Sequence, residues 1–470
     1  MPEQNRFLEG SFAPVAEEIT AFDLPVTGRL PAELSGRYLR NGPNPMGLDD
    51  PAGRWPSGMQ APSAASYHWF LGPGMVHGVR LRDGRAEWYR NRWVRSRLRA
   101  ESLGETWRAG PVHADMDFAA NTHIISHAGR TLATVEAGPL PYELSYELDT
   151  LGPCDFGGTL PGGFAAHTKV DPRTGDLHAI AYYWGWDHVQ HVVIDTTGRV
   201  SRTTDIPVAD GPMMHDFALT GNYVVLYDLP VTFSMDAVTA GQQYPYTWNP
   251  AHQARVGLLP RDGSAGDIRW IEVDPCFVFH TLNAYDDGHR VVADLCRYPR
   301  GYDVATLGGH GPVTLDRWTI DPAAGKVAEE RLDDRGQEFP RVNDRLASQP
   351  HRYGYSVVIG EVNEATAPLS GDFTDDAFAN ALLKHDLARG TVETHGFGRD
   401  AAVGEGVFAP AAPDAAEDDG YVMAFVHDPD RGAADLVILA AQDFTSEPVA
   451  RIHLPARIPL GFHGSWIADQ

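Results

Sequence analysis

The sequence predicts an all-β protein, and among all-β folds it favours a β-propeller. Its 48 glycines and 35 prolines are spread along all 470 residues, which argues against long helices and for many short elements joined by tight turns. A second observation is a unit that recurs between about residues 80 and 430: a β-rich run, an Asp-containing turn closed by Gly, and another β-rich run. Repetition of antiparallel hairpins over this length indicates four-stranded blades arranged around an axis.

The recurring units are hairpin signals, because Gly accepts the positive φ that tight Asp-Gly and Asp-x-x-Gly turns demand. Six of them follow one another along the chain: VRLRDGRAEWY, TKVDPRTGDLHAIAY, VVIDTTGRVSRT, NAYDDGHRVVAD, RWTIDPAAGKVAEE and LLKHDLARGTVETH. Seven blades would have roughly 65 residues each, enough for four strands and their loops. A tandem of β-sandwiches is the alternative, but it offers no common axis. We expect one propeller domain over residues 1–470.

Composition indicates a globular enzyme and excludes one class of partner. Hydrophobic residues make up 43% of the chain and charged residues 21%. The net charge of -25 disfavours nucleic acid, since binding its phosphates requires a basic face. Three cysteines without metal-motif spacing favour a reducing compartment, and the sequence shows neither a signal peptide nor 18 uninterrupted apolar residues. We therefore expect a cytoplasmic protein, with peripheral membrane contact left open.

Four histidines have similar surroundings, each inside or at the end of an apolar, strand-like stretch. They are His167 in AHTK, His215 in MMHDF, His280 in FVFHTLN and His463 in GFHGSW. Their separations of 48, 65 and 183 residues correspond to about one, one and three blades, so all four would face the axis. Imidazole suits iron, copper, zinc and nickel, and an all-imidazole set leaves the positive charge of the metal intact. The pattern predicts an axial redox metal, although a lone histidine is more often a surface or core residue.

Three glutamates in apolar settings fit the same site. They are Glu136 in LATVEAG, Glu338 in QEFPRVND and Glu405 in VGEGVFAP. A buried carboxylate is costly unless it is paired or hydrogen-bonded. Metal-bound histidines usually donate their second N–H to such a group, which fixes the tautomer and the ring angle. Each glutamate alone would also be compatible with a surface or turn position.

Searches for other chemistry fail. GPGMVHG at residues 72–78 has the wrong spacing for a dinucleotide loop and no βαβ setting. The chain has no nucleophile elbow, no His-Glu-x-x-His and no Cys-x-x-Cys. Aromatic residues near the histidines could line an apolar tunnel, although core packing would explain each of them: Phe164, Phe233, Phe277, Phe279, Trp184 and Phe462.

Eight blocks of the chain occur in the order in which a known family has them. They are RYLRNGPNP, GPGMVHGVRL, NTHIISHAGRTLATVEAG, GGFAAHTKVDPRTG, GPMMHDFALTGNYVV, FVFHTLNAYDDG, EFPRVNDR and LGFHGSW. Over nearly its whole length the chain resembles the carotenoid cleavage oxygenases, a family that also contains lignostilbene dioxygenases. Several such blocks in one order are a specific signal.

The resemblance implies a seven-bladed propeller with non-haem Fe(II) on its axis, covered by a dome of loops and short helices. It implies that His167, His215, His280 and His463 are the iron ligands, that Glu136, Glu338 and Glu405 orient three of them, and that Thr122 lies near an open coordination position. In this family O2 adds across one double bond of a conjugated polyene, and the C=C is cut to two carbonyl fragments. No flavin, nicotinamide or external reductant is needed.

The residues around the metal decide the expected substrate. Bacterial relatives that cleave stilbenes hold the phenol hydroxyl with a lysine and a tyrosine; this chain has Val135 at the lysine position and no tyrosine in residues 98–112. We therefore expect a carotenoid or apocarotenoid. The candidates for the substrate and O2 pocket are Thr122, Val135, Phe164, Phe233 and Phe279.

Three alternatives remain open. Within the same chemistry, the protein would be an oxygenase of the lignostilbene or isoeugenol type that cleaves a stilbene or phenylpropanoid double bond. A hydrolytic propeller would use Ca2+ or Zn2+ to activate water, but Ca2+ prefers oxygen ligands. A non-catalytic sterol- or retinoid-binding propeller is the third, and the open metal position that the histidines imply argues against it.

Overall fold

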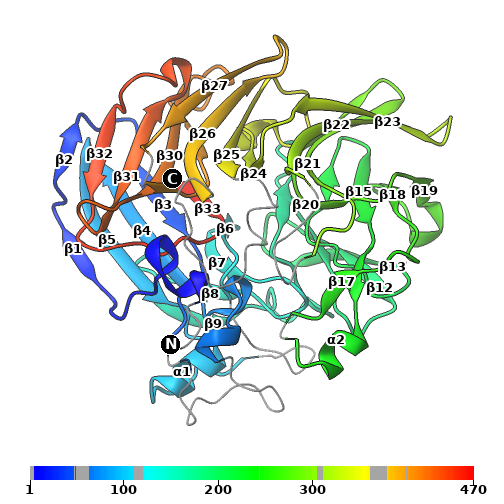
Figure 1. Cartoon of the computed structure of the whole chain (residues 1–470), viewed down its shortest axis with the longest axis horizontal. Helices are drawn as coiled ribbons and strands as arrows, with labels where there is room; N and C mark the ends of the chain where they lie inside the picture. The colour runs from blue at the N-terminus through cyan, green and yellow to red at the C-terminus, as the bar shows by residue number, and fades with distance from the viewer. Residues whose placement is uncertain are drawn as a thin grey trace.

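The computed structural model describes residues 5–46, 48, 63–110, 120–242, 244–303, 311–359, 378–398 and 401–469. In this part of the chain, seven antiparallel sheets form the blades of a propeller, and β16 and β17 form a separate two-stranded ribbon (Figure 1). The predicted all-β, seven-bladed propeller is therefore confirmed. First strands of neighbouring blades pack on one another, as β14 does on β20, β20 on β24 and β33 on β6, so they surround the axis.

Blades 1 to 4 are described from the axis outward. Blade 1 consists of β33 (Gly464–Ala468), β3 (Gly36–Arg40), β4 (Met75–Arg82), β5 (Arg85–Trp93) and β1 (Thr20–Phe22). Blade 2 consists of β6 (His123–His127), β7 (Arg130–Thr134), β8 (Tyr142–Leu144) and β9 (Thr150–Pro153). Blade 3 consists of β10 (Thr168–Val170), β11 (Leu177–Ala181), β12 (His188–Ile194) and β13 (Val200–Pro207). Blade 4 consists of β14 (Ala218–Leu219), β15 (Tyr223–Asp228), β18 (Arg255–Pro260) and β19 (Arg269–Glu272).

Blades 5 to 7 complete the ring. Blade 5 consists of β20 (Phe277–Asp287), β21 (Arg290–Tyr298), β22 (Thr314–Asp321) and β23 (Lys326–Asp333). Blade 6 consists of β24 (Gln337–Arg341), β25 (Tyr353–Ile359), β26 (Phe378–Asp386) and β27 (Thr391–Gly396). Blade 7 consists of β28 (Ala402–Val403) and β29 (Val407–Pro410), which both pair with β30 (Gly420–Asp428), then β31 (Ala433–Ala440), β32 (Ala450–His453) and β2 (Val26–Gly28). The ribbon joins β16 (Val231–Phe233) to β17 (Tyr246–Trp248).

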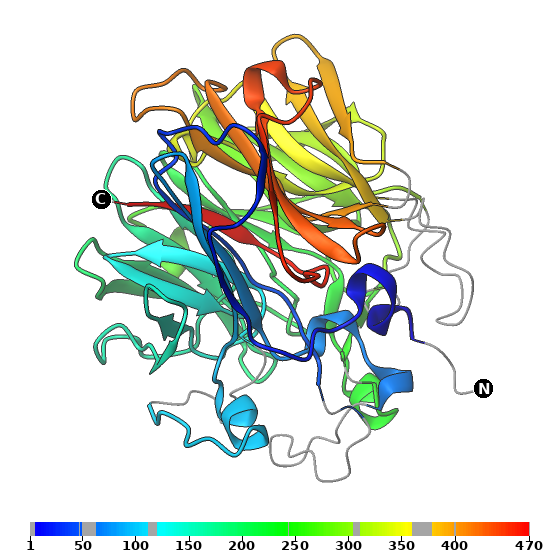
Figure 2. The same ribbon diagram turned by 90° about the vertical axis from the view of Figure 1, so that its left-hand side faces the viewer.

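Both ends of the chain close the ring. The C-terminal strand β33 pairs with β3, with Tyr38 opposite Trp466, and the N-terminal strand β2 pairs with β32, with Val26 opposite Ile452. Figure 1 shows the blue β2 beside the orange-red β32, and Figure 2 shows the red C-terminal strand crossing the blue N-terminal strands. Neither blade 1 nor blade 7 is complete without residues from both ends.

All six predicted hairpins are present. They are β4–β5, β10–β11, β12–β13, β20–β21, β22–β23 and β26–β27. In the first, Asp83 and Gly84 have φ of +50° and +69°, the left-handed conformation that an Asp-Gly turn needs. The hairpins were predictable because each is specified by a few adjacent residues.

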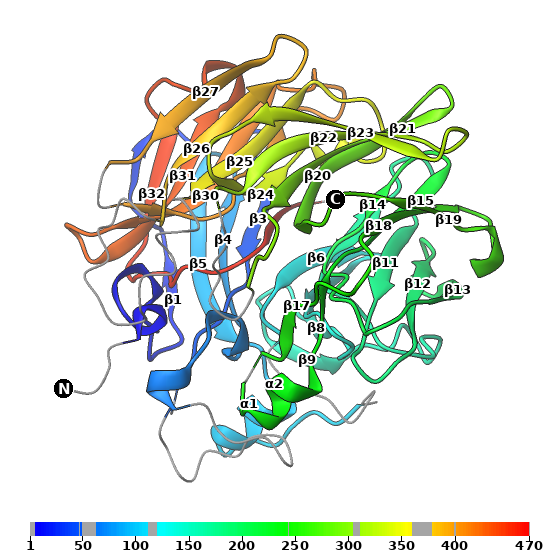
Figure 3. The same cartoon turned by 45° about the vertical axis from the view of Figure 1, so that its right-hand side comes forward.

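The two described α-helices lie at one end of the molecule (Figures 1 and 3). Helix α1 (Arg97–Ser102) and helix α2 (Met235–Thr239) begin at serines, Ser96 and Ser234, whose hydroxyls accept a backbone N–H of the first turn. Both lie at the lower end of the views in Figures 1 and 3, in the predicted dome of loops and short helices. The 3-10 turns are η1 (Arg6–Leu8), η2 (Gly10–Phe12), η3 (Ala64–Ser66), η4 (Trp69–Leu71), η5 (Ala265–Asp267), η6 (Asp344–Leu346) and η8 (Ala441–Asp443). None of the described helices is long and apolar enough to span a bilayer.

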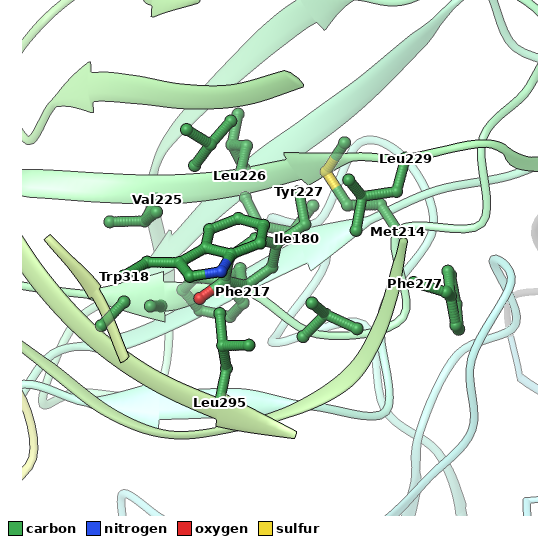
Figure 4. Packing of buried hydrophobic residues seen from close by; sticks show 14 of the residues in the cluster. Ile180, Met214, Phe217, Val225, Leu226, Tyr227, Leu229, Phe277, Leu295 and Trp318 are labelled. Carbon is green, nitrogen blue, oxygen red and sulfur yellow. The ribbon is translucent and has the colours of Figure 1, made fainter. Parts of the chain in front are cut away.

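Packing between blades supplies the core. Figure 4 shows one such region, where the indole of Trp318 lies among Val225, Tyr227 and Leu295, which come from neighbouring blades. Trp318 is completely buried, and its ring meets Tyr227 edge to face with centroids 6.0 Å apart. Middle strands such as β11, β15 and β31 are covered on both faces and read as nearly continuous apolar runs, and burial of each large side chain contributes about 1.5–3 kcal/mol.

Candidate metal centre

The structure brings the four predicted histidines together on the propeller axis. His167 directly precedes β10, His215 lies just before β14, His280 lies in β20 and His463 directly precedes β33. One ligand-capable nitrogen from each lies within 4.8 Å of the others. Nε2 of His167 is 3.0 Å from Nε2 of His215, which is 3.3 Å from Nε2 of His280. All four residues are at most 8% exposed.

Each of the three predicted glutamates hydrogen-bonds one of these histidines. Nδ1 of His215 donates to Glu136 at 2.5 Å, Nδ1 of His280 donates to Glu338 at 2.5 Å, and Nδ1 of His463 donates to Glu405 at 2.8 Å. A carboxylate can only accept here, so these three Nδ1 atoms carry the proton and each ring's other nitrogen has a free lone pair.

The resulting donor set fits a cation. Fixed tautomers turn the unprotonated nitrogens of His215, His280 and His463 toward one small volume, and the Nε2 atom of His167 adjoins them. Lone pairs that converge at such distances repel one another unless a cation lies between them. Four neutral imidazoles match the preferences of first-row transition metals, and a hard cation such as Ca2+ would require oxygen ligands.

Further side chains hold the glutamates in place. Glu136 accepts the hydroxyls of Tyr182 and, at 3.0 Å, Tyr244. Glu338 accepts the hydroxyl of Tyr298 at 2.9 Å. These three tyrosines come from other parts of the ring, and the sequence carried no local signal that would have found them.

Glu405 is held by charge as well. Nη1 of Arg341 lies 2.9 Å from its carboxylate, and the backbone N–H of Gly464 donates to it at 2.9 Å. Because Gly464 follows His463 directly, Glu405 accepts hydrogen bonds both from the ring of His463 and from the next backbone N–H. Arg341 was also missed by the sequence reasoning, although it stands in the quoted EFPRVNDR block.

A bulge in β24 directs two of these groups inward. The pairing of β24 with β25 shifts register between Glu338 and Arg341. Phe339 lies inside the bulge with φ of +54°, and its N–H donates to Glu338. Its ring stacks on that of His280, with centroids 5.7 Å apart. Pro340 cannot donate to a ladder, which is consistent with a bulge at this position.

The electrostatics keep two of the histidines neutral. Burial, together with the neighbouring imidazoles, lowers the pKa of His167 and of His463 well below the ordinary 6.5. Burial also opposes the charge on His280, but the charge and hydrogen bond of Glu338 outweigh it and raise the pKa of His280. Burial would raise the pKa of Glu136, whereas His215 and the two tyrosines lower it. Unprotonated histidines are the form that binds metals.

The predicted pocket residues fall in different places. Phe279 meets His215 edge to face, with centroids 5.0 Å apart, and also contacts Phe70. Phe70 in turn meets Phe462, whose ring centroid is 5.7 Å away. Phe277, also expected near the histidines, packs on Phe279 at 4.7 Å. The tetrad therefore has an aromatic wall, of which Phe70 was not predicted.

The other candidates are more distant or have other contacts. The carbonyl of Thr122 accepts the N–H of His463 at 3.0 Å, so this residue does adjoin the centre. Val135, which directly precedes Glu136, is buried. Phe233 stacks on the half-exposed Trp184, with centroids 5.1 Å apart. Phe164 packs on Phe156 in an apolar cluster between blades 2 and 3, so core packing accounts for it.

A cavity of about 230 Å3, lined by both polar and apolar side chains, adjoins His167, His280 and His463. Its wall includes Lys169 and Asp216, whose charged groups lie 3.0 Å apart. His123 also lines it; its ring centroid is 5.4 Å from that of His463, and its Nε2 donates to the carbonyl of Gly464 at 3.2 Å. The centre thus borders aromatic side chains and also a cavity whose wall carries charged groups.

Comparison with known proteins gives a consistent picture. The family described as "Retinal pigment epithelial membrane protein" matches residues 12–468. A protein of Mycobacterium tuberculosis named carotenoid cleavage oxygenase is 45% identical over 98% of this chain and 97% of its own. The crystal structure of the lignostilbene dioxygenase of Pseudomonas brassicacearum superposes with a TM-score of 0.83 at 28% identity, covering 99% of both chains. Cobalt-substituted apocarotenoid oxygenase of Synechocystis superposes with a TM-score of 0.81 at 28% identity, covering 97% of both chains.

Proposed function

Because the chain belongs to the family of the retinal pigment epithelial membrane protein, with its carotenoid cleavage oxygenases, we propose that it is an Fe(II)-dependent dioxygenase that cleaves a C=C double bond of a carotenoid or apocarotenoid. Relatives of the chain are named carotenoid cleavage oxygenase and carotenoid cleavage dioxygenase, which are oxidoreductases, and this chain is an oxidoreductase. We propose one iron per chain and a single oxygenase domain formed by the whole ring. A cytoplasmic location, with peripheral membrane contact for uptake of the substrate, completes the proposal.

One observation carries this proposal: four histidine nitrogens within 4.8 Å of one another, three of them oriented by buried glutamates. His167, His215, His280 and His463 would hold the iron, and Glu136, Glu338 and Glu405 would fix three of the rings. When bound there, ferrous iron supplies the redox chemistry by which O2 is added across the double bond. Both oxygen atoms end in the two carbonyl products, so no external reductant is required.

The protein's own residues bind the polyene and align it. Phe279, Phe70 and Phe462 form an aromatic wall beside the tetrad and offer apolar contact to a conjugated chain. Positioning one double bond at the centre selects the bond that is cut, because a reaction of this kind depends on the alignment of the reacting atoms. The glutamates keep Nδ1 of three histidines protonated and so keep their other nitrogens directed at the centre.

Two features favour a polyene over a phenolic stilbene. Val135 occupies the position at which stilbene-cleaving relatives have a lysine, and residue 135 is buried beside Glu136. The relative named carotenoid cleavage oxygenase is 45% identical to the chain, against 28% for the lignostilbene dioxygenase. The close superposition of that dioxygenase keeps the stilbene or isoeugenol-type reaction as the second candidate.

The test is product identification under 18O2. Protein reconstituted with Fe(II) is incubated with a panel of β-apocarotenals and with 4-hydroxystilbenes, and the products are analysed by mass spectrometry. We expect two carbonyl fragments from a polyene, each carrying 18O, and none from protein treated with a chelator. Efficient stilbene turnover without polyene cleavage would establish the second candidate. Calcium without iron in the purified protein would instead indicate a hydrolytic propeller.

A further inference from the structure

His463 is set apart from the other three histidines by its place in the chain. His167, His215 and His280 begin three consecutive blades, whereas His463 begins the strand that closes the ring. It is the last residue of a connecting segment, residues 454–463, that contains no helix or strand. The position of this histidine therefore depends on what holds that connection.

The backbone around His463 is held from two sides. The N–H of Asn41 donates to the carbonyl of His463 at 3.1 Å, and the carbonyl of Asn41 accepts the N–H of Phe462 at 3.0 Å. The N–H of His463 donates to the carbonyl of Thr122 at 3.0 Å. Two segments far apart in the sequence, residues 40–42 and 120–123, thus meet at one ligand.

The side chain of Asn41 joins these two segments. Its Nδ2 donates to the carbonyl of Ala120 at 2.8 Å, and its Oδ1 accepts the N–H of Gly42 at 3.0 Å. Asn41 is completely buried. Its amide therefore ties the end of β3 to the connection that leads into β6, and both segments bond the backbone of His463.

Residues 40–42 and 459–461 pack against each other so closely that no space remains between their backbones. A Cβ on Gly42 would lie 2.6 Å from the Cα of Gly461, and a Cβ on Gly461 would lie 2.7 Å from the Cζ of Arg40. The guanidinium of Arg40, which is itself buried, donates to the carbonyl of Pro459 at 2.6 Å. Because the two backbones touch, a displacement of residues 40–42 is transmitted to His463.

We propose that Asn41 is a positioning residue for the metal centre, which couples closure of the propeller ring to the geometry of His463. The inference rests on the proposed function, since it requires a metal at the tetrad. It has a thermodynamic consequence. A metal bound to all four histidines links blade 1 to blades 3, 4 and 5, so metal binding and the docking of residues 40–42 stabilise each other.

The motif RYLRNGPNP, which contains Asn41, also provides a matched control. Asn44 lies three residues further on and is also buried, but its Nδ2 and Oδ1 both bond the backbone of Val15 at 2.8 Å. Asn41→Ala and Asn44→Ala each remove one amide that bonds backbone groups. Loss of stability alone should therefore be similar in the two variants, and only the first acts on the backbone that carries His463.

The experiment uses Co(II) as the probe on the full-length chain. We expect Asn41→Ala to weaken Co(II) binding by about tenfold and to change the d–d absorption bands, and Asn44→Ala to stay within about twofold of the natural chain with unchanged bands. Equal affinities and spectra for the two variants would overturn the inference. A natural chain that binds neither Co(II) nor Fe(II) would instead overturn the proposed function, and the inference with it.

A second measurement avoids the variants altogether, in case Asn41→Ala does not fold. Hydrogen exchange of the natural chain is compared with and without Co(II). We expect the metal to slow exchange at the amides of Asn41, Phe462 and His463 more than at Arg29 and His453, which donate across the other closure, between blade 7 and the N-terminal strand. Equal protection at both closures would contradict the coupling.

Discussion

Replacing Glu338 by glutamine should weaken the metal centre without unfolding the propeller. Its carboxylate, 3% exposed, accepts three donors: Nδ1–H of His280, the hydroxyl of Tyr298 and the N–H of Phe339. A glutamine amide has one oxygen and turns an NH2 group toward at least one of these donors. The burial excludes water as a replacement, and even where the amide oxygen accepts Nδ1–H, His280 loses its charged acceptor.

The expected size follows from the lost contact. A hydrogen bond to a charged group contributes about 1.5–3 kcal/mol, and loss of the outer partner of a metal-bound histidine typically costs about 10–100-fold in metal affinity. Since about 1.4 kcal/mol corresponds to a factor of ten, the two figures agree. Tyr298→Phe keeps the carboxylate and its bond to His280 and removes one of the three donors, so it should weaken metal binding by less than Glu338→Gln does.

The assay is an anaerobic Fe(II) titration of metal-free protein against a chromophoric chelator, with circular dichroism to verify the fold. Glu330→Gln is the matched control, because Glu330 is exposed on the outer strand β23 and the chemical change is the same. A Glu338→Gln variant that binds Fe(II) as tightly as the Glu330→Gln control would refute the role assigned to this carboxylate.

Three further predictions address the tetrad, the core and a buried histidine. His280→Ala should lose stoichiometric iron and the formation of aldehydes; a variant that retained both would show that the ligand assignment is wrong. Trp318→Ala should lower the free energy of unfolding by about 3–5 kcal/mol in urea denaturation, since the fully buried indole leaves a cavity between blades. His252 has a raised pKa because it bonds Asp228 and, against the opposing effect of burial, also Asp210. Its stabilising contribution is complete below pH 6.5 and is lost as the pH rises through the raised value, so the advantage of the natural chain over His252→Asn should shrink as the pH rises above 6.5; a constant difference would contradict this.

Features specified by neighbouring residues could be predicted from the sequence. The turn at Asp83 and Gly84 is one, and the spacing of His167, His215 and His280 by whole blades is another, because each blade has a similar length. These signals were sufficient to predict the fold class and to predict that the histidines share a common axis. The assignment of the four histidines as ligands stays a prediction until a metal is measured.

Contacts across the ring could not be predicted. Tyr244 lies 108 residues from Glu136, and Arg341 lies 64 residues from Glu405, so no spacing rule connects them. An apolar side chain also gives no indication of the face on which it packs. For that reason Phe164 was expected in the pocket and packs in the core, while Phe70, which packs on Phe279, was not expected near the centre.

The charges around the tetrad give an independent reason to expect a divalent metal. Glu136, Glu338 and Glu405 carry three negative charges, Arg341 carries one positive charge, and the pair of Lys169 and Asp216 is neutral. The buried centre therefore has an excess of two negative charges, and uncompensated buried charge is strongly destabilising. The raised pKa of His280, which Glu338 causes against the effect of burial, has the same origin, because a proton compensates part of this charge. A divalent cation held by four neutral imidazoles compensates all of it.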